Sequence, residues 1–152
     1  MRKNLFLCFL LFSVISCTKY DDISIVDVRV DNISFQSTSQ ILLTLGVKVD
    51  NPTKKTLVLR EGILEVFRNE QNLATMTVSD PAIVAPKSNE YNKLVVQVRA
   101  KDLMALYSMS MSGNISPESF DVEGFLKIKA GTASRKMKID RMNLNDLLQS
   151  LK

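Results

Sequence analysis

Residues 41–52, ILLTLGVKVDNP, set the pattern from which the fold can be predicted. Apolar residues occupy every second position from Ile41 to Val49, with mostly polar or small residues between them. A period of two is typical of a β-strand with one buried face. Asn51-Pro52 then ends the strand, because proline has no amide proton for the ladder and asparagine can bond the turn backbone.

The same alternation recurs on both sides of this segment. It is found in residues 23–35, 64–66, 94–99, 120–130 and 136–140. In 23–35 the apolar positions change parity, which predicts a bulge or bend near Asp31-Asn32. Turn-forming residues separate the strands at 37–39, 51–53, 69–72, 80–81, 86–89 and 130–132. We therefore expect an all-β fold, an immunoglobulin- or fibronectin type III-like sandwich of about seven antiparallel strands.

Two segments follow a helical period instead, so one or two short helices are expected beside the strands. In residues 102–107, Leu103, Leu106 and Tyr107 share one helical face, and Asp102 is the expected N-cap. Near the end of the chain, leucines recur at helical spacing from 144 to 151, and Asn143 is the expected cap.

The first 17 residues have the composition of an export signal. A positive start at Arg2 and Lys3 precedes an apolar run, which is too short for a spanning helix of about 20 apolar residues. The run ends in Val14-Ile15-Ser16-Cys17, which resembles the lipobox of bacterial lipoproteins. The expected organisation is a signal peptide over 1–16, cleaved between Ser16 and Cys17, a tether over 17–22 and one domain over 23–152.

The lipobox resemblance implies lipidation of Cys17, and with it a place in the bacterial cell envelope. In that family the cysteine thiol receives a diacylglyceryl group, and two or more acyl chains give stable membrane anchoring. We expect the outer membrane, in its periplasmic or surface leaflet. The alternative is an ordinary secretory signal in which Cys17 has no special role.

A second resemblance concerns the domain itself. Its features are the strand ending in 47–52, the segment 57–59, a hairpin around Gln71-Asn72, a turn at 85–88 before 94–98, and the segment 120–128. In this order they resemble the late-embryogenesis-abundant type 2 family, also called the water-stress and hypersensitive-response domain, over residues 24–141. The resemblance implies a sandwich similar to fibronectin type III domains, and a protective or binding role linked to stress rather than catalysis.

The composition narrows the chemistry that the domain can perform. The chain has no histidine, and its two cysteines, Cys8 and Cys17, both precede the domain. Histidine-based catalysis, histidine metal sites and disulfides are therefore excluded from the domain. Without the signal peptide the chain has 18 basic and 16 acidic residues, and the basic residues are spread along the sequence, which argues against nucleic-acid binding.

The side chains of the domain could support two further kinds of chemistry. Carboxylates could form a glycosidase-like pair, although a solvated sheet surface explains them better. The carboxylate candidates are Glu61, Glu65, Asp80, Glu90, Asp121 and Glu123. Met104, Met109 and Met111 could bind Cu(I), although methionine more often fills a core.

The sequence thus predicts a membrane-anchored, non-catalytic interaction module with no cofactor and no metal, whose partner is an envelope protein or glycan. An alternative is a binding protein for a glycan, lipid or hydrophobic ligand, held on a sheet face or between the sheets. A carboxylate-based hydrolase is the third hypothesis.

Overall fold

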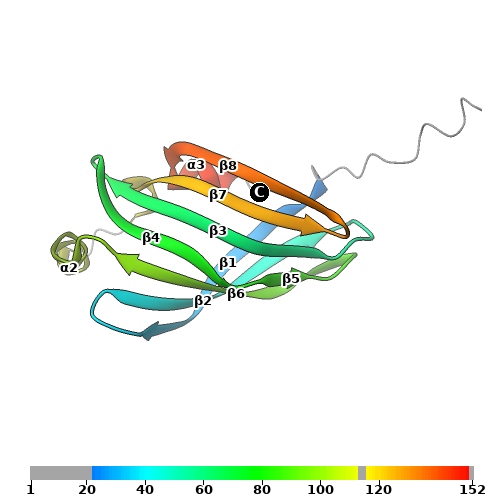
Figure 1. Ribbon diagram of the computed structural model, residues 1–152, viewed down its shortest axis with the longest axis horizontal. Helices are drawn as coiled ribbons and strands as arrows, with labels where there is room; N and C mark the ends of the chain where they lie inside the picture. The colour runs from blue at the N-terminus through cyan, green and yellow to red at the C-terminus, as the bar shows by residue number, and fades with distance from the viewer. Residues whose placement is uncertain (1–21, 113–115, 151–152) are drawn as a thin grey trace, which may run out of the picture.

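The computed structural model describes residues 22–112 and 116–150, which form eight strands and two α-helices (Figure 1). In chain order these are β1 (Ser24–Phe35), β2 (Gln40–Asn51), β3 (Leu57–Arg68), β4 (Gln71–Asp80), β5 (Ala82–Val84), β6 (Ser88–Ala100), α2 (Leu103–Ser112), β7 (Asp121–Ala130), β8 (Ala133–Asn143) and α3 (Leu144–Ser150). A short 3₁₀ helix, Pro117–Ser119, precedes β7.

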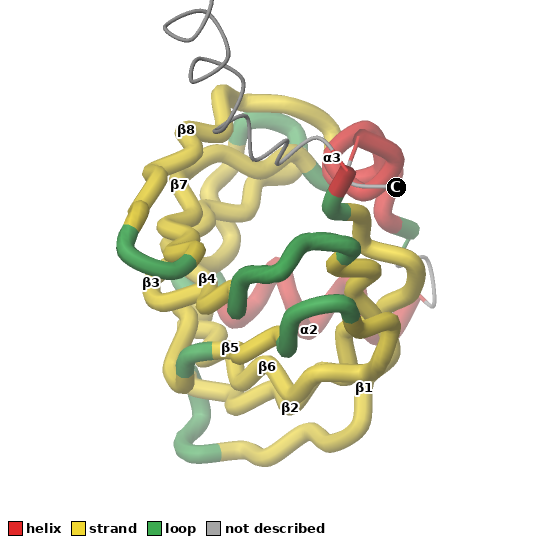
Figure 2. The backbone as a smooth tube through the Cα atoms, turned by 90° about the vertical axis from the view of Figure 1, so that its right-hand side faces the viewer, coloured by secondary structure: helices red, strands yellow, loops and turns green. Residues whose placement is uncertain are grey.

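All strand pairs are antiparallel, so the predicted all-β class with one or two short helices is confirmed. The sheet order is β1-β2-β6-β4-β3-β7-β8, and β5 pairs with β3 beside this path. The two layers of the sandwich are therefore halves of one continuous sheet. Figure 2 shows β3, β7 and β8 on one side of the molecule and β1, β2 and β6 on the other.

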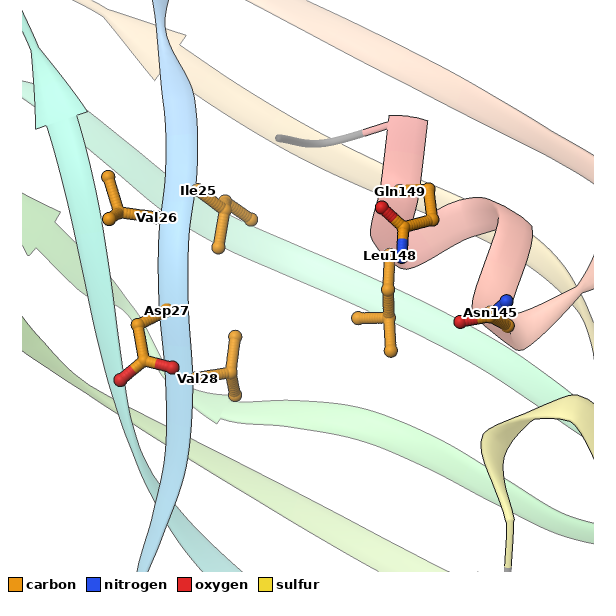
Figure 3. A pocket seen from close by; sticks show the side chains of 7 residues that line it. All are labelled: Ile25, Val26, Asp27, Val28, Asn145, Leu148 and Gln149. Carbon is orange, nitrogen blue, oxygen red and sulfur yellow. The ribbon is translucent and has the colours of Figure 1, made fainter.

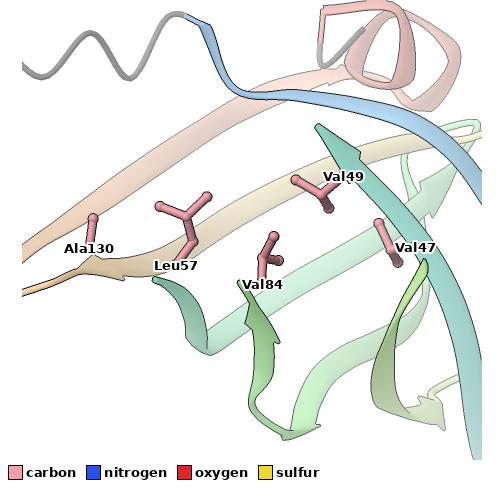
Figure 4. Close-up of a cluster of buried hydrophobic side chains, with 5 residues drawn as sticks. All are labelled: Val47, Val49, Leu57, Val84 and Ala130. Atoms are coloured by element: carbon pink, nitrogen blue, oxygen red, sulfur yellow. The ribbon is translucent and has the colours of Figure 1, made fainter. Parts of the chain in front are cut away.

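The packing of side chains shows that the sheet folds over on itself. Val47 and Val49 of β2 form one buried cluster with Leu57 of β3, Val84 of β5 and Ala130 of β7 (Figure 4). Two strands, β6 and β4, separate β2 from β3 in the sheet. Contact across that interval requires the two halves to face each other, which is how alternating strands bury their apolar face.

Asn51-Pro52 ends β2 as predicted, and the asparagine side chain organises the turn. Asn51 is fully buried, and its Nδ2 donates to the carbonyl oxygens of Lys55, at 2.9 Å, and Ala85, at 2.8 Å. Its Oδ1 accepts from the amide and the hydroxyl of Thr53, at 3.2 and 2.7 Å. The buried amide therefore has partners on both of its polar atoms.

Both predicted helix caps are present. Asp102 Oδ1 accepts from the Ala105 amide at 2.8 Å at the start of α2, and Asn143 Oδ1 accepts from the Asn145 amide at 3.0 Å at the start of α3. Helix α2 extends to Ser112, five residues beyond the predicted end at Tyr107. Leu151, the last leucine of the predicted C-terminal helix, lies outside the described residues.

The hairpin between β3 and β4 turns at Asn69-Glu70, which lies within the predicted break at 69–72. The hairpin position given by the family resemblance, Gln71-Asn72, is two residues too late. Asn69 and Glu70 have φ angles of 48° and 67°, and Gln71 already pairs with Arg68 in the ladder. Two successive residues with positive φ are what a two-residue type I′ hairpin turn requires. Glutamate carries no sequence signal for that conformation, which is why the turn was misplaced by two residues.

Candidate functional site

The predicted lipidation and cleavage positions, Cys17 and Ser16, lie outside the described residues, as do residues 1–21 as a whole. The described part of the domain has candidate sites of its own. Among the described residues, no helix is long and apolar enough to cross a membrane.

Strand β1 carries a row of exposed apolar side chains along an edge of the sheet. Val28, Val30, Ile33 and Phe35 lie opposite Val47, Leu45, Leu43 and Ile41 of β2. Directly opposed residues project from the same face of an antiparallel pair, so this row belongs to the inner, apolar face. Even so, Val30 is 58% exposed and Phe35 is 76% exposed. We call these four residues the β1 row.

A bulge at Asp31 keeps the β1 row on one face. The register of β1 against β2 shifts between Val30 and Asn32, which confirms the bulge predicted near Asp31-Asn32. A second shift, between Ile25 and Asp27, was not predicted. At this shift Val26 has no partner in β2 and is the bulged residue. The sequence gives no sign of this bulge, because Val26 is one of several valines in the strand.

Helix α3 lies between the two edges of the folded sheet. Leu147 of α3 is buried against Val122 of β7 and Ile139 of β8, whereas Leu148 faces β1. A groove of about 230 Å³ separates α3 from β1. In Figure 3, Ile25 and Val28 point toward α3, and Val26 and Asp27 point to the other side of the strand. Asn145 and Gln149 complete the helix side of the groove.

A polar cluster covers the outer face of the same edge. The Tyr91 hydroxyl donates to Asp27 Oδ2 at 2.6 Å, and the Arg29 guanidinium lies 4.1 Å from the centre of the Tyr91 ring. Arg29 also pairs with Asp31 at 2.8 Å. The hydrogen bond to Asp27 raises the pKa of Tyr91 above its ordinary value, and the bond from Tyr91 lowers the pKa of Asp27.

Glu65 makes the most hydrogen bonds of the six candidate carboxylates. Its carboxylate accepts from Lys101 Nζ at 2.7 Å, Asn72 Nδ2 at 2.8 Å and Thr75 Oγ1 at 3.1 Å. Burial by itself would raise the pKa of Glu65, but the hydrogen bonds from Lys101, Asn72 and Thr75, together with the Lys101 charge, outweigh it and lower the pKa. The sequence singled out Glu65 but gave no sign of these partners, which come from β4 and from the segment after β6.

Three of the six candidate carboxylates, Glu61, Glu65 and Asp121, contact basic side chains. Glu65 and Glu123 face each other across β3 and β7. A general acid in a glycosidase-like pair needs a raised pKa, whereas that of Glu65 is lowered. Glu61 instead contacts Lys127 at 3.5 Å, and Asp121 contacts Arg141 at 3.8 Å. None of the six candidate carboxylates lines the groove between β1 and α3 or the groove beside α2.

Metal ligands are not gathered anywhere in residues 22–112 and 116–150, where no group of three or more acidic, histidine or cysteine side chains lies close enough to hold an ion. Of the methionines considered for copper, Met104 and Met111 are exposed on α2. The side chain of Met109 is outside the described part of the structure.

Comparison with known proteins gives similarities of fold only. No protein-family model matches the chain, and no curated protein matches it. A crystal structure of a protein from Archaeoglobus fulgidus is similar over 78% of this chain and 99% of its own, with 13% identity and a TM-score of 0.46. The GAE domain of yeast GGA1 is similar over 79% of this chain and 97% of its own, with 11% identity and a TM-score of 0.33.

Proposed function

We propose that this chain is a lipid-anchored envelope protein whose all-β domain is a non-catalytic interaction module. The observation that carries the binding role is the β1 row, four apolar side chains exposed on an edge strand. The anchor is supported by the lipobox resemblance at Cys17. The resemblance to the late-embryogenesis-abundant type 2 family supports a stress-protective purpose for the binding.

An edge strand offers a partner two kinds of contact. Its outer backbone amides and carbonyls have no ladder partner, since β1 pairs only with β2 among the described strands. Its side chains add apolar surface that a partner would remove from water. An extended segment of an envelope protein that lies along β1 would use both contacts, as in recognition by strand addition.

The binding role can be tested by cross-linking in the native envelope. A photoreactive amino acid at Phe35 of the lipidated protein should give a discrete cross-linked product. The same group at Ile83 is the matched control, because Ile83 is 62% exposed but lies on β5, which does not pair with β1. Equal products from the two positions, or none from Phe35, would contradict the proposal.

The anchor is tested separately. Replacing Cys17 with Ser should abolish the added lipid mass and release the protein from membranes. Mass spectrometry of the wild-type protein that shows an unmodified Cys17 thiol would count against the anchor, whatever the cross-linking shows.

The groove between β1 and α3 favours a second candidate function, the binding of a lipid or another hydrophobic ligand. Ile25, Val28 and Leu148 give the groove apolar walls, and the amides of Asn145 and Gln149 offer hydrogen bonds to a polar end group. Titration with dodecanoate tests this candidate. Saturable binding that Leu148→Asn weakens at least tenfold supports it, and binding unchanged by that substitution contradicts it.

A further inference from the structure

Three loops meet at the end of the molecule where β1 begins, and hydrogen bonds tie them together. The Lys87 amide donates to the Thr53 carbonyl at 2.9 Å, and the Gly131 amide donates to the Thr56 carbonyl at 3.4 Å. Asn51 joins the same loops through the Ala85 carbonyl. The loops after β2, after β5 and after β7 therefore form one surface, which we call the near pole.

The near pole is basic. Residues 50–57, 84–89 and 129–135 contain five basic residues and one acidic residue, Asp50, for a net charge of +4. The basic residues are Lys54, Lys55, Lys87, Lys129 and Arg135. Lys54, Lys87 and Arg135 are exposed. Asp22, where the chain enters β1 at the same end, is exposed and brings the net charge there to +3. From residue 17 onward the chain has 18 basic and 16 acidic residues, a net charge of +2, so the rest of the chain sums to −1.

At the opposite end of the molecule, two segments have no charged residue. Helix α2, at the left in Figure 1, has no charged residue over Leu103–Ser112. The turn between β1 and β2, residues 36–39, has none either. The residues that border these two segments are Arg68, Arg99 and Lys101 with Glu70 and Asp102, a net charge of +1. The opposite end is therefore less basic than the near pole.

The near pole is also where the chain enters the domain. Ser24 pairs with Asp50 at the end of β2, and Ile23 packs against the buried cluster of Figure 4. Asp22 is five positions after Cys17, so an extended tether spans at most about 18 Å between the two. A lipid on Cys17 would therefore hold the near pole close to the membrane surface, within one or two Debye lengths of about 8–10 Å.

We infer that the near pole is a contact surface for the anionic headgroups of the membrane that carries the anchor. The orientation of the domain in this inference rests on the proposed lipid anchor. The attraction to anionic headgroups rests on the basic residues alone. Each lysine or arginine near an anionic surface contributes about 1 kcal/mol, roughly fivefold in partitioning. The contact would set the domain upright on the membrane, with α2 pointing away from it.

The test uses the chain from residue 17 onward with Cys17→Ser, so that no lipid contributes to binding. The folded body starts at Asp22, and circular dichroism checks that it is intact. Flotation with phosphatidylglycerol-containing vesicles should recover the protein, and pure phosphatidylcholine vesicles should not. The triple variant K54Q/K87Q/R135Q should lower the partition coefficient about 100-fold, from three factors of about five.

A second triple variant, R68Q/K93Q/R99Q, removes the same net charge away from the near pole and should change partitioning less than threefold. Equal losses in both triple variants, equal recovery with neutral vesicles, or no recovery with anionic vesicles would each overturn the inference. An unmodified Cys17 in the native protein would instead overturn the anchor and leave these vesicle results unchanged.

Discussion

Asn51 shows how one buried polar side chain can hold several loops. Its amide group makes four hydrogen bonds, to Lys55, Ala85 and twice to Thr53, and its side chain has no exposure to solvent. Aspartate could accept from Thr53 but could not donate to the two carbonyls. Asparagine therefore suits this position better than aspartate, which has almost the same shape.

Replacing Asn51 with Ala should lower the free energy of unfolding by about 3 kcal/mol, because the substitution removes four hydrogen bonds made by a buried side chain. Urea denaturation measures the change. Asn92→Ala is the matched control, since Asn92 makes one exposed bond, to the Glu90 carbonyl at 2.9 Å, and should cost under 1 kcal/mol. Similar losses for the two variants would show that Asn51 does not hold the loops.

Glu65 makes stability depend on pH in the acid range. Its pKa in the folded protein is lowered from the ordinary 4.5, so its contribution is fully present above pH 4.5 and is lost as the pH falls through the lowered value. Glu65→Gln should cost about 1 kcal/mol or less at neutral pH, because the Lys101 side chain is 44% exposed and water screens the pair.

The difference between wild type and Glu65→Gln should shrink toward zero below pH 4.5, as measured by urea denaturation across pH 2–7. Glu61→Gln serves as the control, because Glu61 is 60% exposed and its contact with Lys127 is 3.5 Å long. A Glu65→Gln deficit that stays constant through the acid range would mean that the carboxylate charge is not the source of the stability.

At the scale of elements, the β3–β4 hairpin carries strain at Glu70. Glu70 has a φ of 67°, in the left-handed region, where the Cβ atom of any residue other than glycine comes too close to a carbonyl oxygen. Glycine has no Cβ and avoids this steric cost. Glu70→Gly should raise the free energy of unfolding by about 0.5–1 kcal/mol. The same substitution at Glu90, inside β6, should lower stability by about 0.5–1 kcal/mol. Thermal denaturation of both variants checks the opposite signs.

The elements also show what the sequence could predict and what it could not. Alternation located the long strands, and the parity change in 23–35 located a bulge, because both follow from which face is buried. The caps Asp102 and Asn143 were found because capping is local. The single continuous sheet was not foreseen, since the β4–β6 pairing that joins its halves depends on tertiary contacts.

The candidate site also combines features that follow from local sequence with features that depend on tertiary contacts. The β1 row was visible as a run of apolar residues, but alternation implies burial, and the exposure of Val30 and Phe35 depends on what the rest of the chain leaves uncovered. Similarly, Lys101 lies 36 residues from Glu65 in the sequence, and only the folded sheet brings the two together. Local chemistry was predictable, whereas contacts between distant strands were not.

At the scale of the whole molecule, α3 occupies the open side of the folded sheet between the β8 and β1 edges. Leu147 anchors it to Val122 and Ile139, and Leu148 faces the groove. Leu147→Ala should lower the free energy of unfolding by about 2–4 kcal/mol, because it leaves a cavity in that cluster. Detachment of α3 would also uncover apolar inner face, so the variant should self-associate in sedimentation velocity experiments.

Leu148→Ala is the internal comparison, because it removes the same atoms from the half-buried side of the same helix. It should cost less than half as much as Leu147→Ala and leave the protein monomeric, since α3 stays in place. If the two alanine variants lose equal stability, or if Leu147→Ala unfolds without associating, α3 does not act as the cover of the inner face. The β1 row would then be one part of a larger open apolar surface rather than a site bounded by α3.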